Sequence, residues 1–222
     1  MLAWHYISVN NIAHMSVERR NIGELEVSNV AFGTYKLGMK PQPEEAVDLL
    51  GHAYESGVNF FDTSDNYLGA ELLIAQAMRE GKLPRDDIVI ATKTGLATSE
   101  YEAREFHERN VDQDTSPERI RRKIEASLRL LDVEAIDLYQ MHVHDPSVEA
   151  EEIAGVLGDL KREGKIREWG VSNYNTTSDI DGIVRAADAQ GVDRPVTLQN
   201  YYNMFDPRVA PAIEAAKNEK LA

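Results

Sequence analysis

Short apolar runs rich in β-forming residues alternate along the chain with longer amphipathic stretches that carry helix signals. The apolar runs predict strands at residues 27–34, 57–63, 87–93, 135–142, 166–173 and 195–200. The amphipathic stretches predict helices at residues 43–57, 69–81, 116–131, 147–164, 175–191 and 206–220. Strand and helix thus repeat with short links, which indicates parallel strands joined by right-handed crossovers.

Several boundaries of these elements have their own chemical signals. Ser116 and Pro117 place a capping hydroxyl and a first-turn proline at the start of one helix. Glycines follow four helical stretches, where a left-handed residue costs least, at positions 57, 81, 164 and 191. Ahead of the first strand, ERRNIGELEVSN predicts a β-hairpin with its turn at Gly23-Glu24.

Two architectures fit this order, an open doubly wound sheet and a (β/α)8 barrel. A dinucleotide-binding doubly wound sheet should show G-x-G-x-x-G after its first strand. The first strand ends instead in AFGTYKLG, which does not match. This mismatch favours the barrel but does not decide the matter, because the pattern contains six units and a barrel has eight.

Composition narrows the class of protein. The 222 residues are 42% hydrophobic and 28% charged, which suits one globular domain with a sizeable core. The absence of cysteine excludes a disulfide framework, thiol catalysis and cysteine-ligated metals, and favours a cytoplasmic protein. No run of eighteen apolar residues encodes a membrane span.

The charge balance is strongly acidic, with 24 basic and 38 acidic residues and a net charge of −14. A nucleic-acid-binding protein would need a basic stripe, so nucleic acid is not an expected partner. An acidic surface of this kind keeps a protein soluble by self-repulsion, as in salt-adapted proteins.

The N-terminal residues differ from the rest. The first fourteen lack both a secretory signal and the periodicity of a helix or strand, and Met15 opens a segment that looks like a better beginning. We therefore interpret residues 1–17 as a loose tail or mis-assigned start and residues 18–222 as the barrel domain.

Polar residues stand at the ends of the predicted strands, where functional groups collect in parallel folds. In chain order these residues are Gly33 and Thr34, Asp62, Lys93, His142, Ser172 and Asn173, and Gln199. Period-two alternation places several of them on faces shared with apolar residues, aimed at one mouth. A further aspartate, Asp65, is interpreted as a helix cap or turn residue.

The residues around one of these strand ends suit proton transfer to a carbonyl. Lys93 ends an apolar run, so its ammonium needs a partner, and Asp62 on the neighbouring strand is the expected one. Tyr67 follows directly in the next loop, and a cation beside a phenol lowers its pKa, which makes it a better acid. His142 could orient the carbonyl by a hydrogen bond.

This constellation has no nucleophile and no electron source, so a reduction would need a borrowed hydride. The amides and hydroxyl of Ser172, Asn173 and Gln199 suit a carboxamide such as nicotinamide. Residues 94–115 form a long polar loop at the same mouth. Tyr35, Tyr101 and Phe106 are the predicted pocket residues. Histidine spacing indicates no metal site.

The motifs FFDTSDNY, VIATK, IDLYQMH, GVSN and LQNYYN resemble, in order, those of the aldo-keto reductases. The opening RRNIGELEVSNVAFGT is similar to that family's hairpin and first strand. The resemblance implies a (β/α)8 barrel and reduction of small aldehydes or ketones with NADPH, or with NADH as the alternative.

The resemblance also implies residue roles. Tyr67 would be the proton donor, Lys93 and Asp62 the pair that tunes it, and His142 the substrate-orienting residue. Asp62 would also lie against the cofactor. The carboxamide would be held by Ser172, Asn173 and Gln199, with Gly33 and Thr34 beneath it.

The chain departs from the family pattern at its end. Family members continue into two more strands, which supply an aromatic that stacks on the nicotinamide and a segment that grips the adenosine phosphates. A non-catalytic binding or regulatory subunit, or a remnant without activity, is therefore the alternative function. Unpaired barrel edges would favour association, which leaves an oligomer open.

Overall fold

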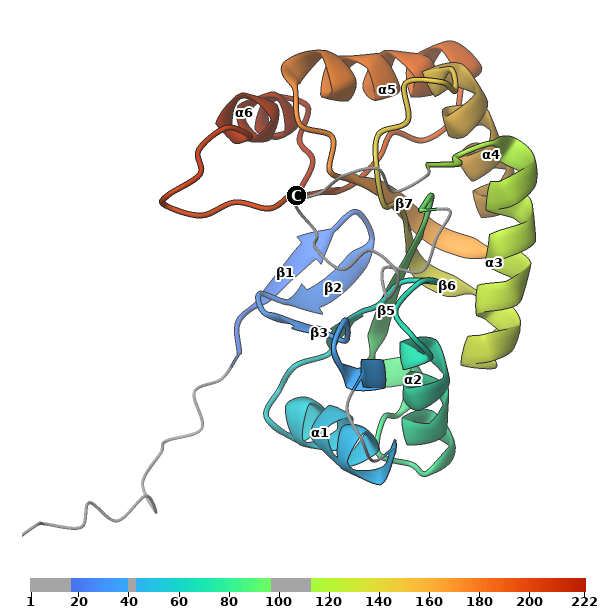
Figure 1. Cartoon of the computed structure of the whole chain (residues 1–222), viewed down its shortest axis with the longest axis vertical. Helices are drawn as coiled ribbons and strands as arrows, with labels where there is room; N and C mark the ends of the chain where they lie inside the picture. The colour runs from blue at the N-terminus through green and yellow to red at the C-terminus, as the bar shows by residue number, and fades with distance from the viewer. Residues whose placement is uncertain (1–16, 40–42, 97–112) are drawn as a thin grey trace, which may run out of the picture.

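The computed structural model of the chain describes residues 17–39, 43–96 and 113–222 (Figure 1). An antiparallel hairpin comes first, formed by β1 (Arg19–Ile22) and β2 (Leu25–Ser28). Gly23 takes a positive φ of 55° in the turn between the two strands, which a glycine adopts without strain. The predicted hairpin and its turn are confirmed.

The main sheet has six parallel strands in sequence order. They are β3 (Ala31–Gly33), β4 (Phe60–Asp62), β5 (Val89–Thr94), β6 (Ile136–Met141), β7 (Ile166–Ser172) and β8 (Leu198–Gln199). A doubly wound sheet would reverse its strand order at one point, whereas this sheet adds each strand beside the previous one and curls (Figure 1). The barrel-type α/β class, with six βα units present, is confirmed.

Helices connect the strands and cover the outer face of the sheet (Figure 1). They are α1 (Pro43–Glu55), α2 (Ala70–Arg79), α3 (Pro117–Leu131), α4 (Ala150–Arg162), α5 (Thr177–Gln190) and α6 (Ala210–Asn218), with short 3-10 turns at η1 (Leu37–Met39) and η2 (Arg85–Asp87). The Ser116 hydroxyl accepts a hydrogen bond from the Arg119 backbone N–H, as the capping signal predicts. The glycines at 57, 81, 164 and 191 all have positive φ.

The first predicted strand is wrong in its extent. Val27 and Ser28 belong to hairpin strand β2, and the barrel strand β3 begins only at Ala31. Ser28 ends β2 because its backbone N–H bonds the Asn59 side chain and its hydroxyl bonds the Val30 carbonyl. The chain turns at this point, so one alternating run contains two strands.

Two apolar clusters build the core. The larger one lies between the sheet and the outer helices. The smaller one lies inside the curl, where Leu25 and Val27 of the hairpin pack on Val89, Ala91 and Leu138. The hairpin thus closes the end of the curl where the strands begin, and it leaves the carboxyl ends of the strands for a site.

The β8 edge is partly covered by the last residue described. Ala222 N–H donates to the Val196 carbonyl at 2.9 Å, and Leu198 N–H donates to the Ala222 carbonyl at 3.0 Å. The loop that follows β8 exposes Tyr201, Tyr202, Met204 and Phe205 by 59–90%. The side chains of Tyr201 and Tyr202 therefore lie outside the apolar core.

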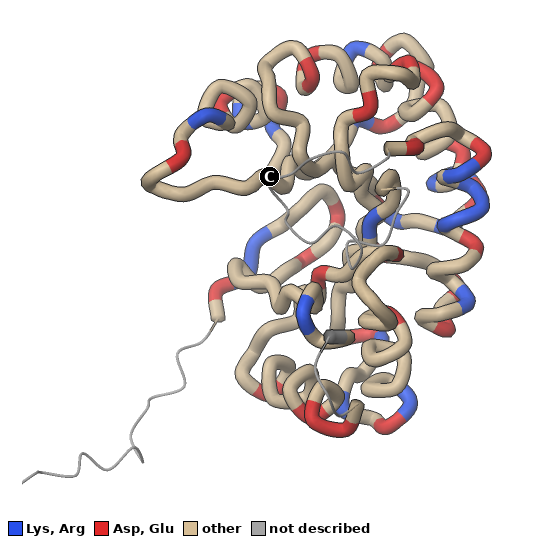
Figure 2. The backbone as a smooth tube through the Cα atoms, in the orientation of Figure 1, with Lys and Arg blue, Asp and Glu red and all other residues tan. Residues whose placement is uncertain are grey.

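Charged residues of both signs are interspersed over the outer helices (Figure 2). Arg121 of α3 bridges Asp159 of α4 and Glu163, which caps the C-terminus of α4, at 2.6 and 2.8 Å. Each such half-exposed ion pair contributes little to the stability of the fold. The pairs therefore mark the solvent-facing side of the helices.

Candidate active site

Lys93 and Asp62 form an ion pair at the carboxyl edge of the sheet. Their strands β4 and β5 are neighbours, and Lys93 Nζ lies 2.7 Å from Asp62 Oδ1. The same ammonium donates to the Thr63 carbonyl at 2.9 Å. The Lys93 side chain is only 1% exposed, so this pairing is what makes a buried charge tolerable there.

Tyr67 lies over this pair. It sits in the short loop between β4 and α2, where its backbone N–H bonds the Ser64 carbonyl in a turn. Lys93 Nζ is 5.1 Å from the centroid of the Tyr67 ring, within the range of a cation–π contact. The structure therefore brings the phenol, the ammonium and the Asp62 carboxylate together.

His142 completes the group from the next strand. It directly follows β6, and its backbone is held at both ends, by N–H donation to the Thr94 carbonyl and by acceptance from the Asn173 amide. Its ring centroid lies 5.7 Å from that of Tyr67, edge to face. Burial, together with the Lys93 charge, lowers the pKa of His142 to about 3, so the ring is neutral at pH 7.

The predicted carboxamide residues lie along the same edge. Ser172 is buried and pairs in register with Gln199, which is exposed. Asn173 follows at once in the left-handed region, φ 57°, and its amide nitrogen is 3.2 Å from the Ser172 hydroxyl. These three side chains offer both donors and acceptors at the mouth.

The two predicted residues at the end of β3, Gly33 and Thr34, have different surroundings. Gly33 is exposed, and a Cβ built on it would meet nothing within 4 Å, so the space beside it is open. Thr34 is buried, and both its N–H and its hydroxyl bond the Asp62 carbonyl, at 2.9 and 3.0 Å. Thr34 thus fastens β3 to β4 under the site.

Of the three predicted pocket residues, Tyr35 lies at the site. Its ring centroid is 5.2 Å from that of Tyr67. Tyr101 and Phe106 lie outside the described residues, as does most of the polar loop 94–115.

Asp65 does not cap helix α2, so the cap alternative is wrong, but it lies in the turn that the Tyr67 N–H closes on the Ser64 carbonyl, so the turn alternative is confirmed. Helix α2 has Gly69 at its N-cap and no side-chain cap. The Asp65 carboxylate instead accepts from the Thr94 hydroxyl at 2.8 Å and lies 3.3 Å from Lys123 Nζ. Burial raises the pKa of Asp65, and Lys123 opposes the shift.

Ser64 is a site residue that sequence reasoning missed. Its hydroxyl oxygen lies 3.0 Å from His142 Nδ1 and 2.7 Å from Asn66 Oδ1, and both Ser64 and His142 are buried. A small polar residue in a loop carries no signal of such a contact in the sequence. Its position inside the DTSDNY motif was the only available hint.

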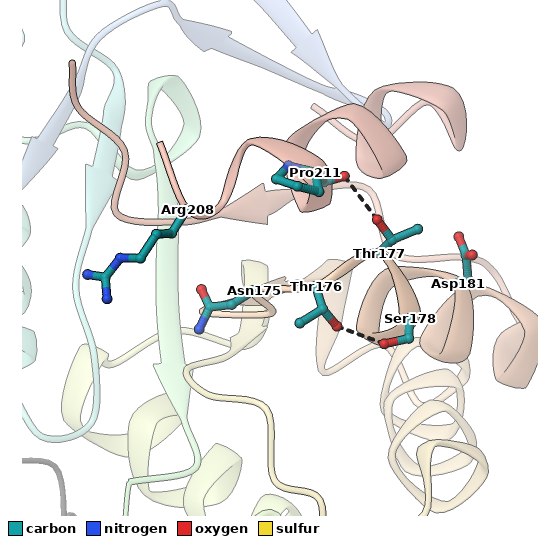
Figure 3. A pocket seen from close by; sticks show the side chains of 7 residues that line it. All are labelled: Asn175, Thr176, Thr177, Ser178, Asp181, Arg208 and Pro211. Carbon is teal, nitrogen blue, oxygen red and sulfur yellow. Dashed lines mark hydrogen bonds between the residues drawn. The ribbon is translucent and has the colours of Figure 1, made fainter. Parts of the chain in front are cut away.

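A separate hollow of about 550 Å³ lies at the N-terminus of α5 (Figure 3). Two of its polar residues have partners of their own: Thr176 forms a capping box with Asp179, and Arg208 makes a bidentate pair with Asp206. Arg208 extends away from the hydroxyl residues Thr176, Thr177 and Ser178 in Figure 3. The basic residue of the lining, Arg208, is therefore already paired and is not a ready partner for an anionic ligand.

Within the described ranges, no cluster of three or more His, Asp or Glu side chains is arranged to hold a metal ion. In the same part of the chain, no helix is both long and apolar enough to cross a membrane.

A curled parallel sheet with titratable groups gathered at its carboxyl edge defines a (β/α)8-barrel type of protein with its site at that edge. A sequence model of the Aldo/keto reductase family matches residues 29–219. The chain therefore belongs to the aldo-keto reductase family.

Individual proteins that resemble the chain support the same family assignment. A probable aldo-keto reductase 1 from Glycine max is 40% identical over 154 residues, which are 66% of this chain and 42% of that protein. An NADH-specific methylglyoxal reductase from Escherichia coli is 31% identical over 165 residues, 68% of this chain and 50% of that protein. The holo form of aldo-keto reductase AKR11C1 from Bacillus halodurans superposes with a TM-score of 0.77 at 26% identity, covering 93% of this chain and 64% of that one. The chain thus spans 42–64% of the length of these relatives.

Proposed function

We propose that the chain is an oxidoreductase that reduces small aldehydes or ketones to alcohols with NADPH, with Tyr67 as the proton donor. The observation that carries this proposal is the convergence of Asp62, Tyr67, Lys93 and His142 from three strand ends onto one mouth. Lys93 Nζ links the group, 2.7 Å from the carboxylate and 5.1 Å from the phenol ring centroid.

Each group has a chemical task in this proposal. Tyr67 donates its hydroxyl proton to the carbonyl oxygen as the C=O π bond breaks and negative charge develops on that oxygen. The Lys93 ammonium stabilises the phenolate left behind, and Asp62 keeps that ammonium charged and in place. His142 and Tyr35 shape the space around the carbonyl.

The residues at the mouth fit a nicotinamide. Ser172, Asn173 and Gln199 supply the hydroxyl and amides that a carboxamide needs, and the open space beside Gly33 leaves room at the first strand. When bound, the cofactor supplies the hydride. NADPH follows the family resemblance, and the NADH-specific relative keeps NADH as the alternative.

The test is NADPH oxidation with a panel of aldehydes and ketones, after a fluorescence titration of NADPH in low and in molar salt. We expect Tyr67→Phe to lower kcat by at least about 10²-fold, the usual contribution of a general acid, while the fold melts as in the wild type. Tyr54→Phe is the matched control, since that phenol bonds Asp87 away from the site. Unchanged turnover in Tyr67→Phe would refute the assigned role.

A second candidate is a binding or regulatory subunit without catalysis. It is favoured by the exposed loop Tyr201, Tyr202, Met204 and Phe205 and by end strands β3 and β8 that each pair with one strand of the sheet. Sedimentation of the purified chain tests it. Self-association that disappears when Met204 and Phe205 are changed to serine, with no turnover, would favour this candidate over the reductase.

A further inference from the structure

The Asp65 side chain joins the loop that carries Tyr67 to two neighbouring elements. This side chain is 4% exposed, and its oxygen Oδ2 accepts a hydrogen bond from the Thr94 hydroxyl at 2.8 Å and lies 3.3 Å from Lys123 Nζ. Thr94 ends β5, and Lys123 belongs to α3. One carboxylate oxygen therefore holds together a loop, a strand and a helix.

The backbone at these positions holds the groups of the candidate site. Asp65 N–H donates to the Lys93 carbonyl at 3.1 Å, and the Thr94 carbonyl accepts from the His142 N–H at 2.7 Å. Asp65 lies two residues before Tyr67, and Thr94 directly follows Lys93. Movement of the Asp65 carboxylate away from Thr94 would therefore shift the Tyr67 loop against the strand end that carries the other site residues.

The charges around Asp65 explain why Lys123 matters to it. Burial raises the pKa of Asp65, and the charge of Lys123 opposes that shift more strongly than the charge of Arg119 does. Burial also raises the pKa values of Glu71 and Tyr139, and the negative charge of Asp65 adds to both shifts. The second carboxylate oxygen of Asp65, Oδ1, is buried and has no hydrogen-bond partner among the described residues. A buried carboxylate in these surroundings needs a cation within ion-pair distance, and Lys123 supplies it.

We propose that Asp65 and Lys123 are positioning residues, which fix the Tyr67 loop against the end of β5 and so hold the phenol where it can donate its proton. Their role in the reaction rests on the proposed reductase function, whereas the fixing of the loop does not. Both residues act through Tyr67 and exchange no proton with the substrate themselves.

The first test measures the loop directly, by amide hydrogen exchange of a peptide that spans residues 60–70 in the protein without cofactor. In Asp65→Asn and in Lys123→Met, we expect this peptide to exchange about 3- to 10-fold faster, which matches a net hydrogen-bond contribution of about 0.5–1.5 kcal/mol. Lys123→Arg keeps the charge and should keep the wild-type exchange. Lys82→Met is the matched control, because Lys82 is similarly exposed, pairs with Asp48 of α1 and lies beyond the far end of α2 from the loop.

The second test asks whether the two residues act through Tyr67. It measures kcat and KM for the reduction of one aldehyde with NADPH, in the wild-type and in the Tyr67→Phe background. Displacing a reacting group by about 1 Å can cost about 10²-fold, so we expect a partial shift in Asp65→Asn or Lys123→Met to lower kcat about 10-fold with little change in KM. In the Tyr67→Phe background the same substitutions should cost nothing further, because the effects of residues that act through one group are not additive.

Unchanged exchange of the 60–70 peptide in both variants would overturn the proposal, as would an equal loss of kcat in the two backgrounds. Faster exchange of all peptides alike would also overturn it, since that pattern reports a loss of global stability. If Asp65→Asn fails to fold, Lys123→Met still gives the reading, because it changes the more exposed partner. The exchange measurement needs no turnover. A wild-type chain without activity, whose loop nevertheless exchanges faster in Lys123→Met, would therefore refute the proposed function and leave the fixing of the loop standing.

Discussion

The ion pair between Lys93 and Asp62 allows a sharp stability prediction. Asp62→Asn keeps the shape of the side chain and removes its charge, which leaves the Lys93 ammonium buried beside neutral groups. Removing one partner of a buried pair typically costs about 3–5 kcal/mol. The Thr63 carbonyl, the Tyr67 ring and the new amide oxygen still face the ammonium. We therefore expect a loss near the low end, about 3 kcal/mol.

The double variant Asp62→Asn/Lys93→Met separates the charge effect from the packing effect. It removes both charges, so the desolvation cost disappears along with the attraction. What remains is the Thr63 carbonyl, which loses its donor, at a cost of about 1–2 kcal/mol. The double variant should thus be more stable than Asp62→Asn alone, although it carries one more substitution.

Urea unfolding measures both variants, with the free-energy difference taken from the shift of the midpoint at constant slope. Asp206→Asn is the control, since Asp206 pairs with Arg208 at the exposed surface and should shift nothing measurable. The reasoning is refuted if Asp62→Asn shifts the midpoint no more than Asp206→Asn does. It also fails if adding Lys93→Met makes the protein less stable still.

Two further predictions concern stability away from this pair. Burial raises the pKa of Glu71, whose carboxylate accepts a hydrogen bond from the Thr92 hydroxyl. The stability that protonation of Glu71 contributes is therefore fully present below pH 4.5, and it is lost as the pH rises through the folded-state pKa. Glu71→Gln should therefore melt higher than the wild type at pH 8 but not at pH 4, and equal differences in paired thermal scans would contradict this. Ser116→Ala removes the α3 cap on the Arg119 N–H and should cost about 1 kcal/mol in urea unfolding; no change would show that water replaces the cap.

The repeating pattern of apolar runs predicted six parallel strands and the helices between them, because each run is short and followed by a helix signal. It failed at residues 27–34, where the hairpin strand and the first barrel strand follow each other without a break in alternation. Only the hydrogen bonds of Ser28 to Asn59 and Val30 reveal the turn between them. Such a turn depends on a residue 31 positions away, which local pattern does not show.

The candidate site was predictable where it follows from strand ends. Asp62, Lys93 and His142 end parallel strands or follow them, and parallel strands meet at one edge. The contacts of Ser64 with His142 and of Asp65 with Lys123 were not predictable in this way. They join a loop to a residue that follows β6 and to a residue on α3, and they depend on side-chain directions that only the packed fold determines.

Those unpredicted contacts explain how a short loop can hold the Tyr67 phenol in place. Backbone pairing of β4 with β5 continues past the strand, since Thr63 N–H bonds the Ala91 carbonyl and Asp65 N–H bonds the Lys93 carbonyl. The Asp65 carboxylate adds Thr94 as an anchor.

The loop before Tyr67 is thus fixed by backbone hydrogen bonds to β5 and by the side-chain hydrogen bond from Thr94 to Asp65. A site held by such supports keeps its geometry before substrate arrives, which is the condition for efficient proton transfer. On this reasoning, the residues that hold the loop matter to the proposed reaction as much as the groups that face the carbonyl.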